Sequence, residues 1–169
     1  MHDNDMRHVT SNENVSTEQL TQWRKMAWQA ARDGVAKGEF PFGAAVCSSS
    51  GQVVSVANNT VATTNNPSAH GEVNAIKAAG RKLDTSDLNG HWLVSTAEPC
   101  PMCLAAIVTA GITRIAFGSA QAIVTQAGYG HLGVTGCELA DEFDDDIEMR
   151  GGILASRCDS LLLDHPSKR

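Results

Sequence analysis

The first regular pattern of apolar residues begins after a polar stretch at the start of the chain. Residues 1–15 show no periodicity, and we expect a loose N-terminal tail there. Ser16 and Gln19 then have the spacing of a capping box, which is typical of helix N-termini. Apolar residues follow at helical spacing, and the pattern ends near Gly34 to Gly38. This segment predicts an amphipathic helix whose apolar face lies in the core.

Short apolar runs alternate with helical patterns through the rest of the chain. Residues 42–47 and 53–57 are apolar and joined by turn residues, which predicts a hairpin. Residues 58–68 are expected to form a polar loop, and residues 119–136 a Gly-rich loop with at most one short helix. Helices are expected over residues 69–82, 102–110 and 151–163, and strands over 91–96, 112–118 and 147–149. This alternation predicts an α/β fold, with helices packed on a mixed sheet.

The composition is that of one globular domain without a strongly basic character. The 169 residues are 42% hydrophobic, enough for a single core, and we assign residues 16–169 to one domain. Lys and Arg total 13 against 19 Asp and Glu, and this net charge of -6 argues against a partner bound through many phosphates. The sequence contains no apolar run of membrane-spanning length and does not start with a signal-peptide pattern. We therefore expect a cytoplasmic protein with reduced thiols.

Two stretches carry residue types that bind metal ions. S-A-H-G-E-V-N-A-I contains His70 and Glu72, and A-E-P-C-P-M-C-L-A-A-I contains Cys100 and Cys103. Each pair stands at the start of a predicted helix, where free N–H groups favour the thiolate form of cysteine. Catalytic zinc takes three protein ligands and leaves a fourth position for water. His70 and the two cysteines fit that arrangement, with Glu72 as the proton acceptor.

The chemistry predicted from these residues is hydrolytic deamination. A bound zinc ion lowers the pKa of water, and Glu72 would accept the water's proton and pass it to a ring nitrogen, so that ammonia leaves. Two other interpretations stay open. A C-x-x-C at a helix start is also typical of a redox dithiol. A structural zinc would need a fourth ligand, for which the sequence offers no obvious residue nearby. Cys47, Cys137 and Cys158 are expected to be packed thiols.

The paired H-x-E and P-C-x-x-C motifs resemble the signature of zinc deaminases. The chain resembles the cytidine deaminase-like superfamily over nearly its whole length: in the first helix, in G-E-F-P-F-G-A-A-V, in N-N-P-S-A-H-G-E-V-N-A-I and in T-A-E-P-C-P-M-C-L-A-A-I. Guanine deaminases and tRNA adenosine deaminases look most similar, although Asn66 and Gly71 replace residues that are usual there. The resemblance implies a three-layer α-β-α sandwich with a mixed five-stranded sheet, one Zn²⁺ per subunit and a homodimer.

The same resemblance implies residues that contact the substrate. Asn59 matches the asparagine that hydrogen-bonds the base in this superfamily, and the backbone N–H of Ala97 is expected to line the site. The alternative for Asn59 is a loop-capping role. In the acidic segment 138–148, Glu142 or Asp141 is a candidate acceptor for the N–H groups of guanine, with a solvated acidic face as the alternative. On the first interpretation, Glu142→Gln would abolish guanine turnover and keep the zinc.

The expected substrate is a free base, a nucleoside or a related amino-heterocycle such as an aminated triazine, with guanine favoured and no nucleic-acid partner. No Lys or Arg stands between Ile115 and Met149, so a pocket bordered by this region would repel a phosphate backbone. The alternative substrate is the wobble adenosine of a tRNA, because the closing stretch I-E-M-R-G-G-I-L-A-S-R-C-D-S-L-L resembles the last helix of the tRNA enzymes. A non-catalytic module with a structural zinc is the alternative of another class.

Overall fold

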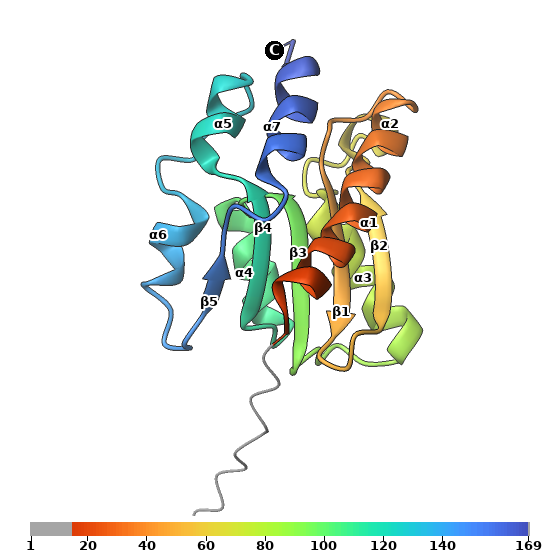
Figure 1. The fold of residues 1–169 in the computed structure, drawn as a ribbon, viewed down its shortest axis with the longest axis vertical. Coiled ribbons are helices and arrows are strands. Elements are labelled where there is room, and N and C mark those ends of the chain that lie inside the picture. The colour runs from red at the N-terminus through yellow and green to blue at the C-terminus, as the bar shows by residue number, and fades with distance from the viewer. Residues whose placement is uncertain (1–14, 169) are drawn as a thin grey trace, which may run out of the picture.

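The computed structural model describes residues 15–168 (Figure 1). Its helices are α1 (Thr17–Val35), α2 (Val61–Thr64), α3 (Gly71–Leu83), α4 (Pro101–Thr109), α5 (Gln121–Gln126), α6 (Gly136–Ala140) and α7 (Ala155–Asp164). Its strands are β1 (Gly43–Ser48), β2 (Val53–Asn58), β3 (His91–Ala97), β4 (Arg114–Ser119) and β5 (Glu148–Arg150).

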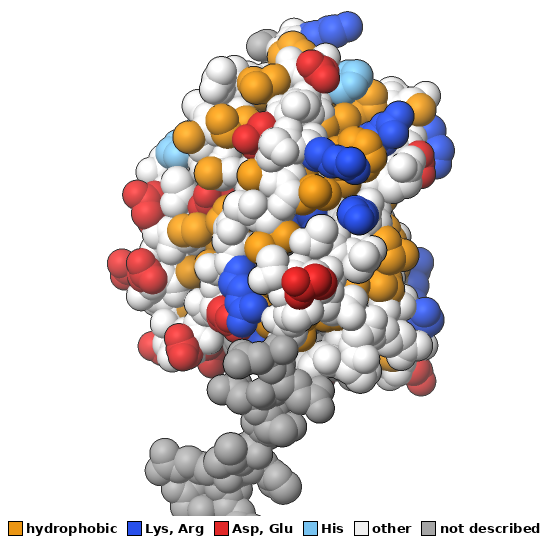
Figure 2. All heavy atoms as spheres, in the orientation of Figure 1, with side chains coloured by type: hydrophobic (Ala, Val, Ile, Leu, Met, Phe, Trp, Pro, Cys, Tyr) orange, Lys and Arg blue, Asp and Glu red, His pale blue; other side chains and the backbone are white. Residues whose placement is uncertain are grey.

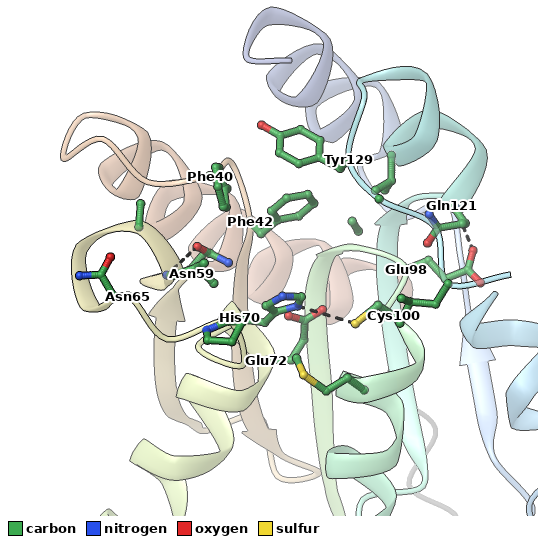
Figure 3. Close-up of a pocket in the computed structure, with 18 residues that line it drawn as sticks. Phe40, Phe42, Asn59, Asn65, His70, Glu72, Glu98, Cys100, Gln121 and Tyr129 are labelled. Carbon is green, nitrogen blue, oxygen red and sulfur yellow. Dashed lines mark hydrogen bonds between the residues drawn. The ribbon is translucent and has the colours of Figure 1, made fainter. Parts of the chain in front are cut away.

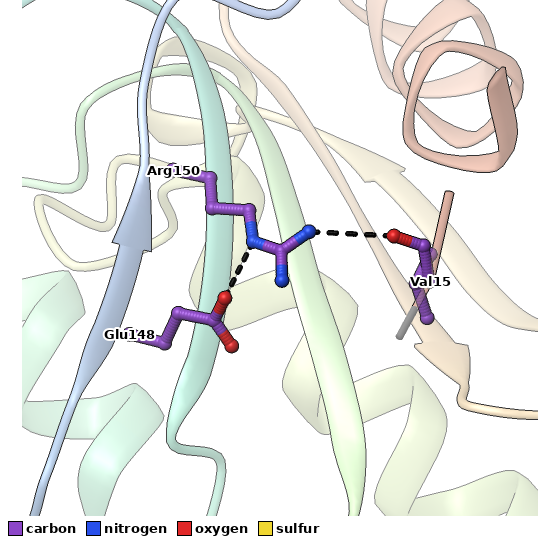
Figure 4. A network of polar contacts seen from close by, with 3 residues as sticks. All are labelled: Val15, Glu148 and Arg150. Atoms are coloured by element: carbon purple, nitrogen blue, oxygen red, sulfur yellow. Dashed lines mark hydrogen bonds and ion pairs between the residues drawn. The ribbon is translucent and has the colours of Figure 1, made fainter. Parts of the chain in front are cut away.

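The expected N-terminal tail lies outside the described residues, except for its last residue. Val15 is buried, with 8% of its surface exposed. Its carbonyl oxygen accepts a hydrogen bond from Arg150, which also pairs with Glu148 (Figure 4). Val15 therefore belongs to the folded domain, one residue before the boundary that the polar pattern indicated.

The strands form one sheet in the order β2-β1-β3-β4-β5. β1 is antiparallel to β2 and β3, whereas β3, β4 and β5 run parallel to one another. The expected mixed five-stranded sheet is confirmed. α1 and α7 cover one face, and α3 and α4 cover the other, which gives the expected three layers (Figure 1). In the described part of the chain, no helix is long and apolar enough to cross a membrane.

The central strands are buried on both faces, as strands between two helical layers must be. Ala44 and Val46 of β1 belong to a cluster with the apolar faces of α3 and α4. Ala45, which lies between them, points to the other face and joins Trp23 of α1 and Trp92 of β3. The two indole rings lie 6.5 Å apart. Because consecutive side chains of a strand alternate between faces, one short apolar run contributes to both cores.

Three short helices lie within or at the end of the segments expected to be loops, and α5 lies within residues 119–136, where at most one short helix was expected. The loop expected over residues 58–68 contains α2, whose backbone N–H groups donate to Glu39 from the segment before β1. α6 starts at the end of the other expected loop, and Thr135 and Glu138 close a complete capping box around its N-terminus. The first contact is tertiary and leaves no local pattern, whereas the second is a T-x-x-E spacing that is readable from the sequence.

The closing helix starts later than its apolar pattern predicted. Gly152 and Leu154 have φ values of 82° and 55°, in the left-handed region. Because an α-helix cannot pass through residues in that conformation, α7 starts at Ala155. Its apolar face is the expected one, with Cys158 and Leu161 buried.

Candidate metal centre and cavity

The ends of four strands meet at one edge of the sheet, and the candidate site lies there (Figure 3). β1 runs antiparallel to β3, so the start of β1 lies beside the ends of β3 and β4. The residues just before β1 and just after β2, β3 and β4 include Phe42, Asn59, Glu98 and Gln121. In α/β folds the crevice beyond the strand ends is the usual binding site. Topology thus brings together residues that are distant in sequence.

Both halves of the metal site are helix N-caps. His70 caps α3 with φ -68° and ψ 158°, and Cys100 caps α4 with φ -66° and ψ 165°. Pro101 occupies the first turn of α4, where its missing N–H costs no helical hydrogen bond. Cys103 lies in the same turn and is fully buried. Each cap has extended backbone, which directs its side chain away from its own helix and toward the other half-site.

The three candidate ligand atoms are close enough to share one ion. His70 Nδ1 lies 3.4 Å from Cys103 Sγ and 3.7 Å from Cys100 Sγ. All three atoms lie within 4.8 Å of one another. A tetrahedral zinc ion, with bonds of about 2.0 Å to nitrogen and about 2.3 Å to sulfur, would separate these atoms by about 3.6 Å. The spacing and the donor set fit zinc. Among the described residues, this group contains three ligands, which leaves one tetrahedral position for water or substrate.

The two thiols are held in an arrangement that favours a cation. Their mutual hydrogen bond, together with His70, lowers the pKa of Cys100 to about 4, so that this sulfur is a thiolate at neutral pH. The same hydrogen bond, together with burial, raises the pKa of Cys103. A second thiolate beside the first would be repelled by it. A bound divalent cation removes that conflict and lets both sulfurs ligate as thiolates.

Glu72 lies in the first turn of α3, at the floor of a cavity (Figure 3). Its side chain is only 7% exposed. Burial raises the pKa of Glu72 to about 7, although the neighbouring His70 works against this shift. A carboxyl group in this range can both accept and release a proton near neutral pH. Glu72 stands beside the three ligands without belonging to their group, which is the position that a proton-transfer residue requires.

A cavity of about 650 Å³ opens above these residues. Phe40, Phe42 and Tyr129 form one wall, with Tyr129 edge-on to both phenyl rings at centroid distances of 5.8 and 4.9 Å. The full lining is Phe40, Phe42, Asn59, Val61, Ala62, Asn65, Pro67, His70, Glu72, Ala97, Glu98, Cys100, Met102, Gln121, Val124, Tyr129, Gly130 and Leu132. This size and mostly apolar lining suit one flat organic molecule.

Two of the amide side chains that line the cavity, Asn59 and Gln121, have a hydrogen-bonding atom left for a ligand. Asn59 is 2% exposed, and its Oδ1 accepts the N–H of Val61 at 3.0 Å, so its Nδ2 is left to donate to a ligand. The backbone N–H of Gln121 donates to Glu98 at 3.0 Å, and its Nε2 donates to Thr125 at 3.3 Å. The Oε1 of Gln121 is left to accept, and Figure 3 shows this amide pointing toward the cavity. Asn59 thus has both its capping role and a free donor.

The structure places most of the expected substrate contacts in this cavity. Asn59 and Ala97 line it. Glu142 does not, because the chain carries it to the surface after α6, where it is exposed. This position agrees with the solvated acidic face that was the alternative for Glu142, and its contact with the substrate stays a prediction. The carboxylate at that wall is Glu98, which the sequence analysis did not select and which accepts backbone N–H groups from the starts of α5 and α6.

Comparison with known proteins places this site in a family context. The family model described as "Cytidine and deoxycytidylate deaminase zinc-binding region" matches residues 17–119. The tRNA-specific adenosine deaminase of Bacillus subtilis is 32% identical, over 83% of this chain and 84% of that protein. The guanine deaminase of the same organism is 36% identical, over 62% and 67%. The tRNA-specific adenosine deaminase of Aquifex aeolicus is 40% identical over 56% of this chain.

The chain spans 62% of the Aquifex protein's length, and 17% and 22% of two tRNA(Ile)-lysidine synthases from Deinococcus deserti and Deinococcus radiodurans. Among solved structures, a mutant protein in complex with 8-azaguanine has a TM-score of 0.79 at 25% identity, covering 86% of this chain and 84% of that one. The guanine deaminase of Bacillus subtilis has a TM-score of 0.61 at 35% identity, covering 64% and 69%. A tRNA:A34 deaminase has a TM-score of 0.66 at 25% identity, covering 83% and 99%.

Proposed function

Because this chain belongs to the cytidine and deoxycytidylate deaminase zinc-binding family, we propose that it hydrolytically deaminates a free nucleobase, nucleoside or related amino-heterocycle, with guanine preferred. The family is one of zinc-dependent deaminases, and His70, Cys100 and Cys103 are suited to hold one zinc ion. The family relation extends to guanine deaminases and to tRNA adenosine deaminases alike. The choice of substrate therefore rests on the cavity.

The observation that carries the proposal is the chemistry of the cavity wall. An aromatic face, formed with Phe42 and Tyr129, stands above the buried carboxyl group of Glu72. Among the described residues that line the cavity, none is a lysine or an arginine. An uncharged aromatic ring is stabilised by such a wall, whereas a polynucleotide needs cations along its backbone. The lining therefore favours a small, neutral heterocycle.

The residues of this chain would divide the work as follows. Bound zinc supplies the Lewis acidity that makes a water molecule nucleophilic at neutral pH. Glu72 would take one proton from the attacking water and give it to a ring nitrogen. It would then carry the remaining hydroxyl proton to the amino group, which leaves as ammonia while the carbonyl forms, since one buried carboxyl group reaches both. Asn59 donates its Nδ2–H to an acceptor of the base, and Gln121 offers Oε1 to an N–H donor. The aromatic wall keeps bulk water away from the reacting carbon.

A guanine ring has donors and acceptors that match these two amides. Its carbonyl oxygen and ring nitrogens accept hydrogen bonds, and its N–H and amino groups donate them. A structural neighbour at 25% identity was solved with 8-azaguanine, a molecule of the same shape. This supports guanine as the first substrate to examine.

The second candidate is the wobble adenosine of a tRNA. It is favoured by the tRNA-specific adenosine deaminase of Bacillus subtilis, which is similar over 83% of this chain and 84% of that protein. An anticodon loop would have to approach a cavity whose described lining contributes the carboxyl groups of Glu72 and Glu98 and no cation. On this reading, phosphate contacts would come from surfaces outside the cavity.

Ammonia release from a substrate panel separates the two candidates. The zinc-loaded protein is incubated with guanine, guanosine, adenine, adenosine, cytosine, cytidine, an aminated triazine and unmodified tRNA, with Glu72→Ala as the inactive control. We expect release from guanine and none from tRNA. Release from tRNA alone, with tight binding that weakens steeply as salt is raised, would establish the second candidate and overturn the first. Zinc content that is retained without any ammonia release would point to a structural zinc.

The remaining proposals concern the molecule as a whole. We propose that residues 16–169 form a single catalytic domain and that the protein acts as a homodimer, as its resemblance to the superfamily implies. Two thiolate ligands require a reducing compartment, which supports a cytoplasmic location. Sedimentation equilibrium of the zinc-loaded protein tests the assembly: a dimer mass is expected, and a monomer at micromolar concentration would contradict it.

A further inference from the structure

A second hollow lies between α1 and α7, on the face of the molecule shown in Figure 2. Its volume is about 400 Å³, and it shares no lining residue with the catalytic cavity. It is lined by Trp28, Arg32, Ser156, Arg157, Ser160, Leu161, Asp164 and His165. We call it the α1–α7 groove. Its lining includes two arginines, a histidine and two serines, with a single carboxylate, although the whole chain carries a net charge of -6.

Both arginines of the groove are held against one indole ring. The guanidinium carbon of Arg32 lies 4.9 Å from the ring centre of Trp28, and that of Arg157 lies 5.6 Å from it. The ring itself is fixed, because Trp28 Nε1 donates a hydrogen bond to the carbonyl oxygen of Arg157 at 3.2 Å. Cation–π attraction therefore holds each of these two exposed guanidinium groups beside the Trp28 ring. The N–H groups of both arginines stay available to a ligand, because a guanidinium group that lies against a ring face does not use its N–H donors there.

Among residues 15–168, these two cations have no counterion. In the part of the chain that the structure describes, no carboxylate lies within ion-pairing distance of Arg32 or Arg157. Asp164 lines the groove without pairing with either. Figure 2 shows Lys and Arg side chains gathered over α1 and α7, whereas most Asp and Glu side chains of this face lie near α6 and β5. Two like charges held together without a partner leave a local surplus of positive charge, which an anion would neutralise.

We propose that the α1–α7 groove is a binding site for the phosphate group of a nucleotide. Guanidinium groups bind phosphate through pairs of N–H donors, and two of them line this groove. The Ser160 hydroxyl donates to the backbone oxygen of Ser156, which leaves the Ser156 hydroxyl beside Arg157 as a further donor. The volume is in the range of small-ligand sites and holds a nucleoside monophosphate. This site does not depend on which heterocycle the enzyme deaminates.

The groove touches the catalytic cavity through the end of α7. His165 lines the groove, and its carbonyl oxygen accepts a hydrogen bond from the Tyr129 hydroxyl at 2.5 Å. Tyr129 belongs to the aromatic wall of the cavity. The N–H of Ser167 also donates to the carbonyl oxygen of Ala127 at 2.8 Å, so the chain after α7 is tied to the loop that carries Tyr129. A ligand that fixes His165 therefore fixes one wall of the cavity, and nucleotide binding will change the KM of the deaminase reaction.

Calorimetric titration tests the site directly. Guanosine 5′-monophosphate and inorganic phosphate are titrated into the zinc-loaded protein at constant ionic strength, with guanosine as the ligand that lacks the phosphate. Arg32→Gln and Arg157→Gln each remove one guanidinium group, and Arg81→Gln, on α3 and outside both hollows, is the control of equal charge change. We expect saturable monophosphate binding that each groove variant weakens by about tenfold, the loss of one charge-assisted contact. The Arg81→Gln protein is expected to bind as the wild type does.

Several outcomes overturn the proposal. The first is a titration without saturation for both guanosine 5′-monophosphate and inorganic phosphate. The second is an affinity for the monophosphate that is the same in the groove variants and in the Arg81→Gln protein. The third is saturable binding of a single-stranded RNA without any binding of the monophosphate. Thermal melting of each variant establishes that the fold is intact. The regulatory role is tested by the KM of the best substrate at increasing monophosphate, and an unchanged KM alongside proven binding would overturn that role alone. Since calorimetry needs no turnover, a failure of the proposed function would leave the binding result interpretable.

Discussion

Glu39 stabilises the wall of the cavity that carries Asn59. It is 6% exposed, and its carboxylate accepts the N–H of Ala62 at 3.1 Å and that of Thr63 at 2.7 Å. These two N–H groups belong to the first turn of α2, directly after Asn59. Asn59 is tied to the same turn, since its Oδ1 accepts the N–H of Val61. Replacement of Glu39 by Gln keeps the size of the side chain and removes its charge, which isolates the contribution of this carboxylate.

The expected loss follows from these two hydrogen bonds. Glutamine has one acceptor oxygen, so it can serve one of the two N–H groups, and its NH₂ faces the other. Ala62 and Thr63 are exposed and both hydrogen bonds are part-buried, so water partly replaces a lost acceptor and the loss of one bond costs about 1 kcal/mol, while the remaining bond loses its charge assistance. We therefore expect Glu39→Gln to lower the free energy of unfolding by about 1–2 kcal/mol. A typical domain has about 5–15 kcal/mol in total, so the loss is readily measured.

The same contacts fix how the loss depends on pH. Burial alone would raise the pKa of Glu39, but the hydrogen bonds from Thr63 and Ala62 outweigh it and lower this pKa below its ordinary value. A carboxyl group with a lowered pKa in the folded state contributes stability above its unfolded pKa, which is about 4.3 for glutamate. That contribution is lost as the pH falls through the folded pKa. The wild type and Glu39→Gln should thus differ most above about pH 5 and converge in acid.

Urea unfolding at a series of pH values measures both effects. Glu142→Gln is the matched control, because Glu142 is exposed and lies outside the cavity. This variant should unfold at the same urea concentration as the wild type. In turnover assays, Glu39→Gln should also raise KM more than it lowers kcat, because Asn59 loses its fixed position. The reasoning is refuted if Glu39→Gln is as stable as Glu142→Gln at neutral pH, or if the gap to the wild type widens in acid.

Three further substitutions test separate parts of the site. Cys103→Ala removes a sulfur that lies 3.4 Å from His70 Nδ1, and it should abolish both zinc binding and activity; full zinc content by mass spectrometry of the metal would contradict the ligand assignment. Asn59→Ala should raise KM by about tenfold, the loss of one hydrogen bond to the base, and an unchanged KM would remove Asn59 from substrate binding. Gly136→Ala places a methyl group against the carbonyl oxygen of Pro99, closer than a real contact allows, so it should lower the melting temperature and the activity together. Wild-type melting would show that this contact relaxes freely.

The metal centre was predictable because its signals are local. His70 and Cys100 are helix caps, and each lies within a few residues of the partner that the chemistry requires. A spacing of two or three residues at a helix start fixes which way the side chains point. The apolar pattern of the strands was local as well, which is why the sheet and its two helical layers agree with expectation.

The walls of the cavity were harder to predict from the sequence, because the topology of the sheet brings their residues together. Gln121 and Glu98 meet only because β3 and β4 end at the same edge, and neither residue stands in a pattern that marks it as polar lining. Glu142 shows the limit of a charge pattern, because its exposed position agrees with the solvated face that was the alternative for it. Its acidic surroundings indicated a carboxylate near the substrate, but charge along a sequence does not determine which way a surface segment faces. The short helix α2 depends on Glu39 in the same tertiary way.

Glu72 carries the central claim, and its substitution by glutamine tests that claim most directly. The measurement is the rate of ammonia release from guanine by zinc-loaded Glu72→Gln, compared with the wild type at equal zinc content. Glutamine fills the same buried space but cannot accept a proton, so the rate should fall by about 10²–10⁴-fold while the zinc content stays the same. A Glu72→Gln protein that releases ammonia at the wild-type rate would contradict the account.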